Sequence, residues 1–321
     1  MKRLVVRRLA MLPVMVWLVA TATFLVVQAA PGTYADTIDN PRLTPQARAN
    51  LRAHYGLDRS PASQYLSWLG AVLSGDLGHS FVFKRPVAET IAAALPPTLL
   101  LTGTALLIDL LIGCSVAVVS VRRPGGWADR ALTVLALGVY GMPSFWLAGL
   151  AVAVFSLALG WFPASHMWSV GAGGWPIHLR LADLLHHLVL PAAVLGLVGA
   201  AATARTLRAA VLDIRTSPHI LAARARGVSE RRVLWSHTVR PALGPLATLI
   251  GLSLPVLVSG SVVVETIFSW PGMGRVMWQA AVARDVALVM GCSLVGAVAV
   301  ILGNLAADLL YAAVDPRVRL S

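Results

Sequence analysis

Asp109 stands alone in a long apolar stretch, Thr98–Val119, that holds no other charged residue. If this stretch crosses a membrane, the carboxylate lies near the bilayer centre. Insertion there costs about 2.5–3.5 kcal/mol, so the side chain must find a partner, water or a proton. Two interpretations stay open: the carboxylate lines a path and selects cationic or amine-bearing solutes, or it makes a buried hydrogen bond between helices. Both predict that Asp109 faces the protein interior rather than lipid.

The side chains suited to metal chemistry do not form a recognisable set. Cys114 and Cys292 both lie inside apolar runs, so neither a disulfide framework nor a zinc site is predicted. A group of histidines lies in and beside one loop, but its spacing matches no known metal site. These histidines are His166, His178, His186 and His187.

Catalytic groups are also missing from the sequence pattern. An intramembrane enzyme would need paired polar groups at matching depth, such as Ser–Lys, HExxH or two aspartates, and only Asp109 lies deep. The chain has no GxxxxGK[ST] phosphate loop, so it is not expected to bind ATP itself. We therefore predict no catalytic residue, no metal and no cofactor in this chain.

Three apolar stretches are interrupted where a helix would bend. Gly141-Met142-Pro143-Ser144 interrupts one, and Pro191 and Pro255 interrupt two others. Proline removes a backbone donor and bends a helix, and such breaks either line a transport path or are ordinary in membrane helices. Ser144 and Asn304 join the lone aspartate as possible pathway-lining residues, although Asn304 also suits hydrogen bonding between helices.

Composition places these residues in a membrane protein. Of the 321 residues, 57% are hydrophobic and only 12% are charged, whereas a soluble domain carries about 25% charged residues. The net charge of +12 comes mostly from arginines beside apolar runs, which is typical of membrane topology rather than of nucleic-acid binding. We predict an all-α, polytopic fold, because a backbone in lipid must satisfy its own hydrogen bonds. Its six transmembrane helices lie near Leu9–Ala29, Thr98–Val119, Ala131–Leu159, Leu188–Ala204, Leu243–Val264 and Ala287–Ala313.

The distribution of basic residues sets the expected orientation. With the N-terminus inside, 17 of the 26 lysines and arginines fall in inner segments and 9 in outer ones, so both termini are expected in the cytoplasm. The chain then divides into an N-terminal helix (1–30), an outer loop (31–97) and a five-helix core (98–321) with an inner loop (205–241). A cleaved signal is the alternative for the first helix, but its apolar run exceeds the roughly 7–15 residue core of a signal peptide.

The outer loop carries two helix signals. Thr44-Pro45 and Ser60-Pro61 each place a capping residue before a proline, which suits the first turn of a helix. An apolar stripe at helical spacing follows the second signal and ends near Gly75. We expect two short extracytoplasmic helices, which either cover the bundle or contact a partner outside.

The inner loop is rich in arginine yet carries the punctuation of two helices. Ser217-Pro218 starts a helix and Gly227 ends it. Ser229 caps a second helix, Glu230 lies in its first turn, and the helix should run to about Val239. Two short helices joined at a glycine predict a compact elbow on the cytoplasmic surface.

This inner loop carries a family resemblance. The stretch from Ala222 to Gly227 resembles the Ala-Ala…Gly core of the EAA loop in the membrane subunits of binding-protein-dependent ABC importers. Its continuation to Trp235 resembles the dipeptide/oligopeptide/nickel permease branch, although Leu221 stands where the family has a leading Glu. Further stretches resemble the same branch in order along the chain: Gly75–Phe81, Pro86-Val87, Leu95–Leu99, Glu265–Gly274, Arg284-Asp285 and Asp315–Arg319.

The resemblance implies the fold of a type I ABC importer transmembrane domain and a role in transport. The chain would be a permease subunit that forms half of a translocation pathway in a bacterial cytoplasmic membrane, for peptides or related small solutes. The implied partners are a second, non-identical permease subunit, two cytoplasmic ATPase subunits that bind ATP and Mg, and an extracytoplasmic substrate-binding protein. A secondary transporter working alone is the alternative.

In that family the inner loop carries a coupling helix, which docks into a cleft on the ATPase subunit. ATP-driven closure of the ATPases would move this helix as a rigid lever and switch the pathway between its two orientations. The residues that the resemblance assigns to ATPase coupling are Ser217, Pro218, Leu221, Ala222, Ala223, Arg224, Arg226, Gly227 and Glu230.

Overall fold

The computed structural model describes residues 2–29, 59–244 and 261–314, with isolated positions at 46, 246, 249, 250 and 253. The regular elements in these ranges are all helical, and the β contact within them is an isolated bridge between His79 and Pro86. The described part of the chain therefore confirms the all-α prediction.

Helices that can cross a membrane dominate the fold. One span is not a single helix but a bent pair. It consists of α6 (Trp127–Gly141) and α7 (Ser144–Ala151), and α7 continues as the π-helix η1 (Val152–Ala158). More than half of the predicted span Leu243–Val264, including Pro255, lies outside the described residues. The single helices of spanning length are α1 (Lys2–Ala29), α5 (Val87–Arg122), α8 (Ile177–Arg215) and α15 (Val286–Val314).

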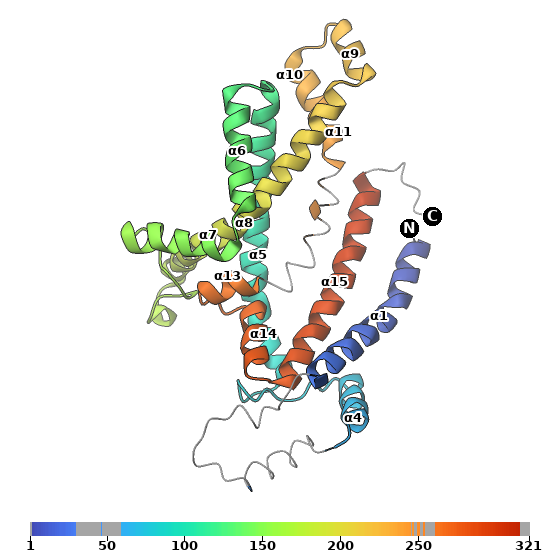
Figure 1. Ribbon diagram of the computed structural model, residues 1–321, viewed down its shortest axis with the longest axis vertical. Helices are drawn as coiled ribbons and strands as arrows, with labels where there is room; N and C mark the ends of the chain where they lie inside the picture. Colours follow the sequence, from blue (N-terminus) through green and yellow to red (C-terminus); the bar gives the residue numbers. More distant parts are fainter. Residues whose placement is uncertain are drawn as a thin grey trace.

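The bent pair falls at the interruption that the sequence indicated. Met142 adopts an extended backbone (φ −83°, ψ 131°) and Pro143 lacks an N–H, so α6 ends and a new helix begins at Ser144. The two halves meet at 105°. The interruption predicted within Ala131–Leu159 is therefore confirmed, and it is a sharp bend: α7 projects almost at a right angle from α6 (Figure 1).

The centre of the molecule is the close packing of α5 against α8. At Gly113, Gly196 and Gly199 an added Cβ would come within 3.0 Å of side-chain atoms on the opposite helix. Only glycine permits this approach, and small residues serve the same purpose at many membrane helix interfaces. Buried apolar side chains, such as Val121 on α5 and Leu207 on α8, fill the rest of this interface.

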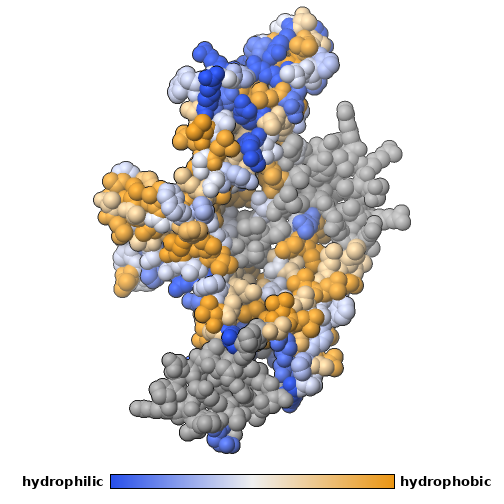
Figure 2. Space-filling model, in the orientation of Figure 1, coloured by the Kyte–Doolittle hydropathy of each residue, from blue (hydrophilic) through white to orange (hydrophobic). Residues whose placement is uncertain are grey.

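The two ends of the molecule differ in content (Figure 1). One end, the elbow end, carries the C-termini of α5 and α8 together with α9 (Pro218–Ala225). The opposite end, the loop end, carries α4 (Pro61–Leu73) and α14 (Met273–Val282). Hydrophilic residues gather over the elbow end, beyond the hydrophobic surface of α6 and α7 (Figure 2).

The first and last spans pack together at one side of the bundle. α1 runs antiparallel to α15, and α4 lies across the loop end of α1 (Figure 1). The hydroxyl oxygens of Tyr65 on α4 and Thr21 on α1 lie 2.6 Å apart, and the Tyr65 and Phe24 rings lie 5.2 Å apart. These contacts favour the interpretation that the second outer helix, which starts at Ser60-Pro61 as predicted, covers the bundle. The first predicted outer helix, after Thr44, lies outside the described residues.

Two spans begin earlier than the apolar pattern suggested. α5 starts at Val87 rather than Thr98, and α8 starts at Ile177 rather than Leu188. The additional turns of α8 contain polar residues, which the apolar pattern did not include. One of them, Asp183, is buried but accepts hydrogen bonds from the backbone N–H (2.8 Å) and the hydroxyl (2.6 Å) of Ser169. The outer loop before α8 is correspondingly shorter than expected.

Candidate functional site

The inner loop folds into a compact unit of four short helical segments, which we call the elbow (residues 217–242). α9 begins directly after Ser217, with proline at its first position, as predicted. The Ser217 hydroxyl does not cap the helix but donates to the Ile214 carbonyl and lies 3.0 Å from Nδ1 of His219. Ser217 therefore ties α9 to the end of α8.

Gly227 ends α9 in the conformation that the sequence predicted. Its φ of +78° lies in the left-handed region, which favours glycine. The Gly227 N–H donates to the Arg224 carbonyl (2.9 Å), and the Val228 N–H donates to the Ala223 carbonyl (3.2 Å). This pair of bonds is the Schellman arrangement, so the last turn of α9 is closed rather than frayed.

The second half of the elbow departs from the predicted single helix. An α-helical turn, α10 (Glu230–Arg232), changes into a π-helix, η3 (Val233–Val239), and returns to α geometry in α11 (Arg240–Ala242). Ser229 occupies the N-cap position, but its side chain makes no capping hydrogen bond. A buried hydroxyl, that of Thr238, donates to the Val233 carbonyl within the widened turn (2.9 Å).

A bidentate ion pair clamps the two halves of the elbow together. Nε and Nη2 of Arg224 lie 2.7 Å and 3.2 Å from the two carboxylate oxygens of Glu230. The hydrogen bond from Arg224 lowers the pKa of Glu230, and the nearby charge of Arg215 acts in the same direction. The family resemblance assigned Arg224 and Glu230 to the coupling loop but did not predict that their side chains pair with each other.

α9 has one face buried in the elbow and one face open. Ile220 and Ala223 are fully buried and pack on Val233. The opposite face is exposed and apolar, with positions at the i, i+3, i+4 and i+7 spacing of a helical stripe. This exposed stripe consists of Pro218, Leu221, Ala222 and Ala225.

Asp109 lies on the face of α5 that packs closely against Gly199 of α8. Its Oδ2 would lie 2.7 Å from a Cβ placed at Gly199, and its Oδ1 is buried without a hydrogen-bond partner in the described part of the chain. With hydroxyl residues that include Ser253 and Ser261, it lines a cavity of about 180 Å³. Asp109 therefore faces the protein interior rather than lipid.

The other two residues suggested for the pathway lie elsewhere. Ser144 is the first residue of α7, at the bend of the third span, and Asn304 is half-buried on α15. Neither lines the cavity that contains Asp109. The structure thus does not gather these three residues into one site.

Two of the histidines near the start of α8 lie within hydrogen-bond distance of backbone carbonyls. Nε2 of His186 lies 2.7 Å from the Trp161 carbonyl, and Nδ1 of His187 lies 3.0 Å from the Asp183 carbonyl. Among the described residues, His, Cys, Asp and Glu side chains do not form a group of three or more that could hold a metal ion.

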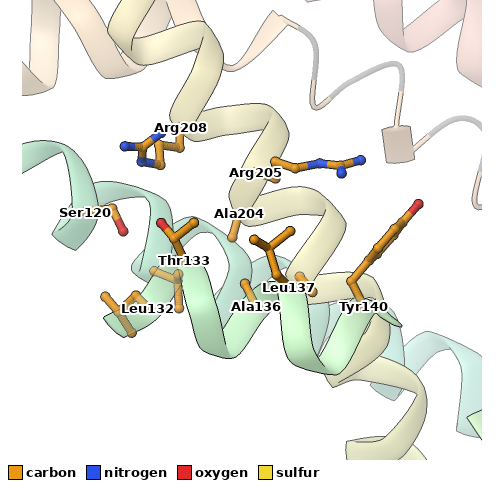
Figure 3. Close-up of a pocket in the computed structure, with 11 residues that line it drawn as sticks. Ser120, Leu132, Thr133, Ala136, Leu137, Tyr140, Ala204, Arg205 and Arg208 are labelled. Atoms are coloured by element: carbon orange, nitrogen blue, oxygen red, sulfur yellow. The ribbon is translucent and has the colours of Figure 1, made fainter. Parts of the chain in front are cut away.

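Two arginines of α8 join this helix to α6, one at each end of α6. Arg208 forms a bidentate ion pair with buried Asp129, at 2.8 Å from each oxygen. The guanidinium of Arg205 lies over the Tyr140 ring, 4.9 Å from its centroid. Figure 3 shows Arg205 and Arg208 along α8, opposite Thr133 and Tyr140 of α6, around a small cavity of about 60 Å³ that also borders α5.

A polar network at the loop end was not anticipated from single residues. Glu265 is fully buried; its Oε1 accepts from the Thr98 hydroxyl and its Oε2 from the Arg275 N–H, both at 3.0 Å. Trp270 is also fully buried, and its indole N–H donates to the Pro97 carbonyl (2.8 Å). The network therefore joins α5 to the segment before α14, two stretches that the family resemblance matched separately.

A second buried carboxylate joins two more of those stretches. Oδ2 of Asp285 accepts from the Ser80 hydroxyl (2.6 Å) and the Val82 N–H (3.0 Å), and its Oδ1 accepts from the Leu288 N–H (3.2 Å). Asp285 thus caps α15 and holds the loop before α5. The loop-end network is hereafter Ser80, Thr98, Glu265, Trp270 and Asp285.

Sequence comparisons extend these observations. Residues 109–320 match the family described as binding-protein-dependent transport system inner membrane component, and residues 1–102 match the N-terminal model of the same membrane component. The chain is 37% identical to the oligopeptide transport system permease protein AppB of Bacillus subtilis (strain 168), over 97% of each chain. It is 38% identical to a putative peptide permease protein of Brucella ovis, over 93% of each chain. It is 35% identical to the glutathione transport system permease protein GsiC of Escherichia coli O6:H1, over 98% of each chain.

Proposed function

Because this chain belongs to the family of binding-protein-dependent transport system inner membrane components, we propose that its elbow is the surface that docks on the ATPase subunits. The chain is a multi-pass membrane protein and a permease subunit of an ATP-binding-cassette importer. Its partners in this proposal are a second permease subunit, two cytoplasmic ATPase subunits and an extracytoplasmic substrate-binding protein. ATP and Mg bind to the ATPase subunits and not to this chain.

The observation that carries the proposal is the exposed apolar stripe of α9. Leu221 is 57% exposed on a helix whose other face is fully buried. A single exposed leucine is ordinary, but an apolar stripe at helical spacing suits a groove on a partner protein. The stripe also ends at a closed turn, so the helix is preformed and loses little conformational freedom on docking.

The elbow is built to transmit motion as well as to bind. Ser217 fastens α9 to α8, and the pair Arg224–Glu230 fastens it to α10. Force applied to the stripe would therefore reach the C-terminus of α8 without first melting the elbow. This supports a lever that moves with the ATPase subunits.

The proposed cargo is a peptide or a related small solute. The relatives named above are described as permeases for oligopeptides, peptides or glutathione, which all carry an amino group. Asp109 offers a carboxylate toward an internal cavity, and in this proposal it contacts a cationic group of the cargo during passage. The test is Asp109→Asn, which should keep the fold and change transport of cationic peptides more than that of anionic ones.

The proposed location is the bacterial cytoplasmic membrane, with both termini inside. The basic residues of the elbow end support this orientation, because positive charge concentrates on the cytoplasmic side of membrane proteins. α1 and α15 run antiparallel, and the free end of each points toward the elbow end (Figure 1).

The docking proposal is tested by placing a charge in the stripe. Leu221→Glu should abolish co-purification of the ATPase subunits with the permease, because a carboxylate would be desolvated in the docking groove. His219→Glu adds the same charge to the same helix off the stripe and should retain co-purification. Equal ATPase recovery with Leu221→Glu and wild type would contradict the proposal.

A further inference from the structure

Two adjoining cavities lie behind the elbow and share Arg122 and Trp235 in their walls. The first, of about 330 Å³, lies between the C-termini of α5 and α8 and the second half of the elbow. The second, of about 450 Å³, continues along α5 toward Cys114. Neither cavity contains a residue suggested for the transport path.

The first cavity is strongly basic. Arg122, Arg215, Arg224 and Arg231 line it, and Glu230 is the acidic residue in its wall. Glu230 is already engaged by Arg224, whereas Arg122 and Arg231 make no ion pair within the described part of the chain. Such a cavity suits a phosphate group, because planar guanidinium donors match phosphate oxygens in pairs.

The second cavity is an apolar groove. One wall is a stripe of α5 that runs from Cys114 through Val118 and Val119 to Arg122, about 12 Å along the helix axis. The opposite wall is formed by the elbow and includes Val239. Two basic residues also line this groove: Arg122 at the end shared with the first cavity, and Arg240 in the elbow wall. The stretch of the groove toward Cys114 is lined mainly by apolar side chains, which suit a hydrocarbon chain.

We propose that the two cavities together bind one anionic phospholipid, with its phosphate in the basic cavity and an acyl chain in the apolar groove. Arg122 is the last residue of the membrane-spanning helix α5 and directly follows its apolar stretch Thr98–Val119, so the basic cavity lies near the depth of lipid headgroups. Trp235 is 45% exposed at the junction, where an indole ring is favoured at the membrane interface. Placing this lipid in the cytoplasmic leaflet rests on the proposed orientation; its binding does not.

Charge and shape together favour a lipid over a protein side chain. A carboxylate from a partner subunit could pair with the arginines but would leave the apolar groove empty. A phospholipid fills both cavities and joins Arg224 and Arg231 of the elbow to Arg122 of α5 through one phosphate. Its binding would thus hold the elbow against the membrane-spanning helices.

The test is native mass spectrometry of the purified importer, titrated with dioleoyl phosphatidylglycerol or dioleoyl phosphatidylcholine. The double variant Arg122→Gln/Arg231→Gln should bind phosphatidylglycerol about 25-fold more weakly, since each arginine near the membrane surface contributes about fivefold. The matched control is Arg123→Gln/Arg232→Gln, which alters the neighbouring exposed arginines that lie outside the cavity. This control should bind phosphatidylglycerol as the wild type does.

A second variant tests the groove independently of the arginines. Val119→Trp fills the apolar cavity from an exposed position and should also weaken phosphatidylglycerol binding. Unchanged lipid binding in both variants would overturn the proposal. It would also be overturned if inorganic phosphate displaced the lipid and Val119→Trp had no effect, which indicates a free phosphate site. Loss of the ATPase subunits from the double variant, with lipid binding unchanged, would assign the arginines to a protein contact instead.

Discussion

The loop end and the elbow end of this permease use particular carboxylate and apolar side chains differently: those at the loop end are buried within the chain, and those at the elbow end are exposed. At the loop end, the carboxylates of Glu265 and Asp285 are fully buried, and their hydrogen bonds are made within the chain. At the elbow end, Glu230 is exposed and Leu221 points its apolar side chain outward. The first arrangement fixes distant segments of one chain to each other. The second presents a surface whose partner must come from another molecule.

Removing the Glu265 carboxylate is expected to have the largest effect. Glu265→Ala leaves the Thr98 hydroxyl and the Arg275 N–H without their acceptor in a buried site, which should cost about 3 kcal/mol. The melting temperature of the purified permease should fall by roughly 5–10 °C. Glu265→Gln keeps one carbonyl acceptor and should lose less. A melting temperature equal to wild type for Glu265→Ala would show that the loop-end network does not hold these segments.

Asp285 should show the next largest effect. Asp285→Ala removes the cap of α15 and the acceptor for Ser80 and Val82, at a cost of about 2 kcal/mol. The expected fall in melting temperature is roughly 4–6 °C. Ser80→Ala removes a single hydrogen bond and serves as the graded control. If Ser80→Ala were as destabilising as Asp285→Ala, the cap would contribute nothing.

Gly227 tests the elbow with a matched backbone control. Both Gly227 (φ +78°) and Gly125 (φ +76°) are left-handed, and neither has an atom within 4 Å of an added Cβ. Valine at either position should cost about 1–2 kcal/mol of strain. Only Gly227→Val should reduce recovery of the ATPase subunits, because only it opens the closed turn of α9. Equal recovery of the ATPase subunits with the Gly227 and Gly125 variants would show that the closed turn of α9 is not needed for docking.

The smallest effect is expected for the exposed clamp. Glu230→Gln should leave the melting temperature unchanged within error, because exposed ion pairs contribute little. The pKa of Glu230 is lowered from 4.5 by Arg224, so the clamp acts fully above about pH 4.5 and is lost as pH falls through the lower value. A spin label at Ala225→Cys should gain mobility on acidification in the wild-type background and not in Glu230→Gln. If the mobility of the label did not depend on pH in either background, the Arg224–Glu230 pair would not be what holds α9 against α10.

Local signals explain what could be predicted from the sequence. Ser217-Pro218 and Gly227 set the backbone conformation of the residues next to them in the chain. Both boundaries of α9 could therefore be predicted from the sequence. The change to a π-helix at Val233 has no comparable local signal. The contact between Thr98 and Glu265 joins residues 167 positions apart, and Asp183 in the extra turns of α8 accepts a hydrogen bond from the backbone N–H of Ser169, which lies outside the helix. Such features depend on tertiary packing, which periodicity and capping rules do not encode.

The pairing of α1 with α15 has a consequence for synthesis of the protein. α1 leaves the ribosome well before α15, the helix on which it mainly packs within the described part of the chain. At about 5–20 residues per second, roughly 260 residues separate the two, so α1 waits on the order of ten to fifty seconds for its neighbour. During that interval the apolar run Ala10–Ala29 must remain in the bilayer without α15. Membrane insertion of the first helix is thus expected to precede, and not to require, assembly of the bundle.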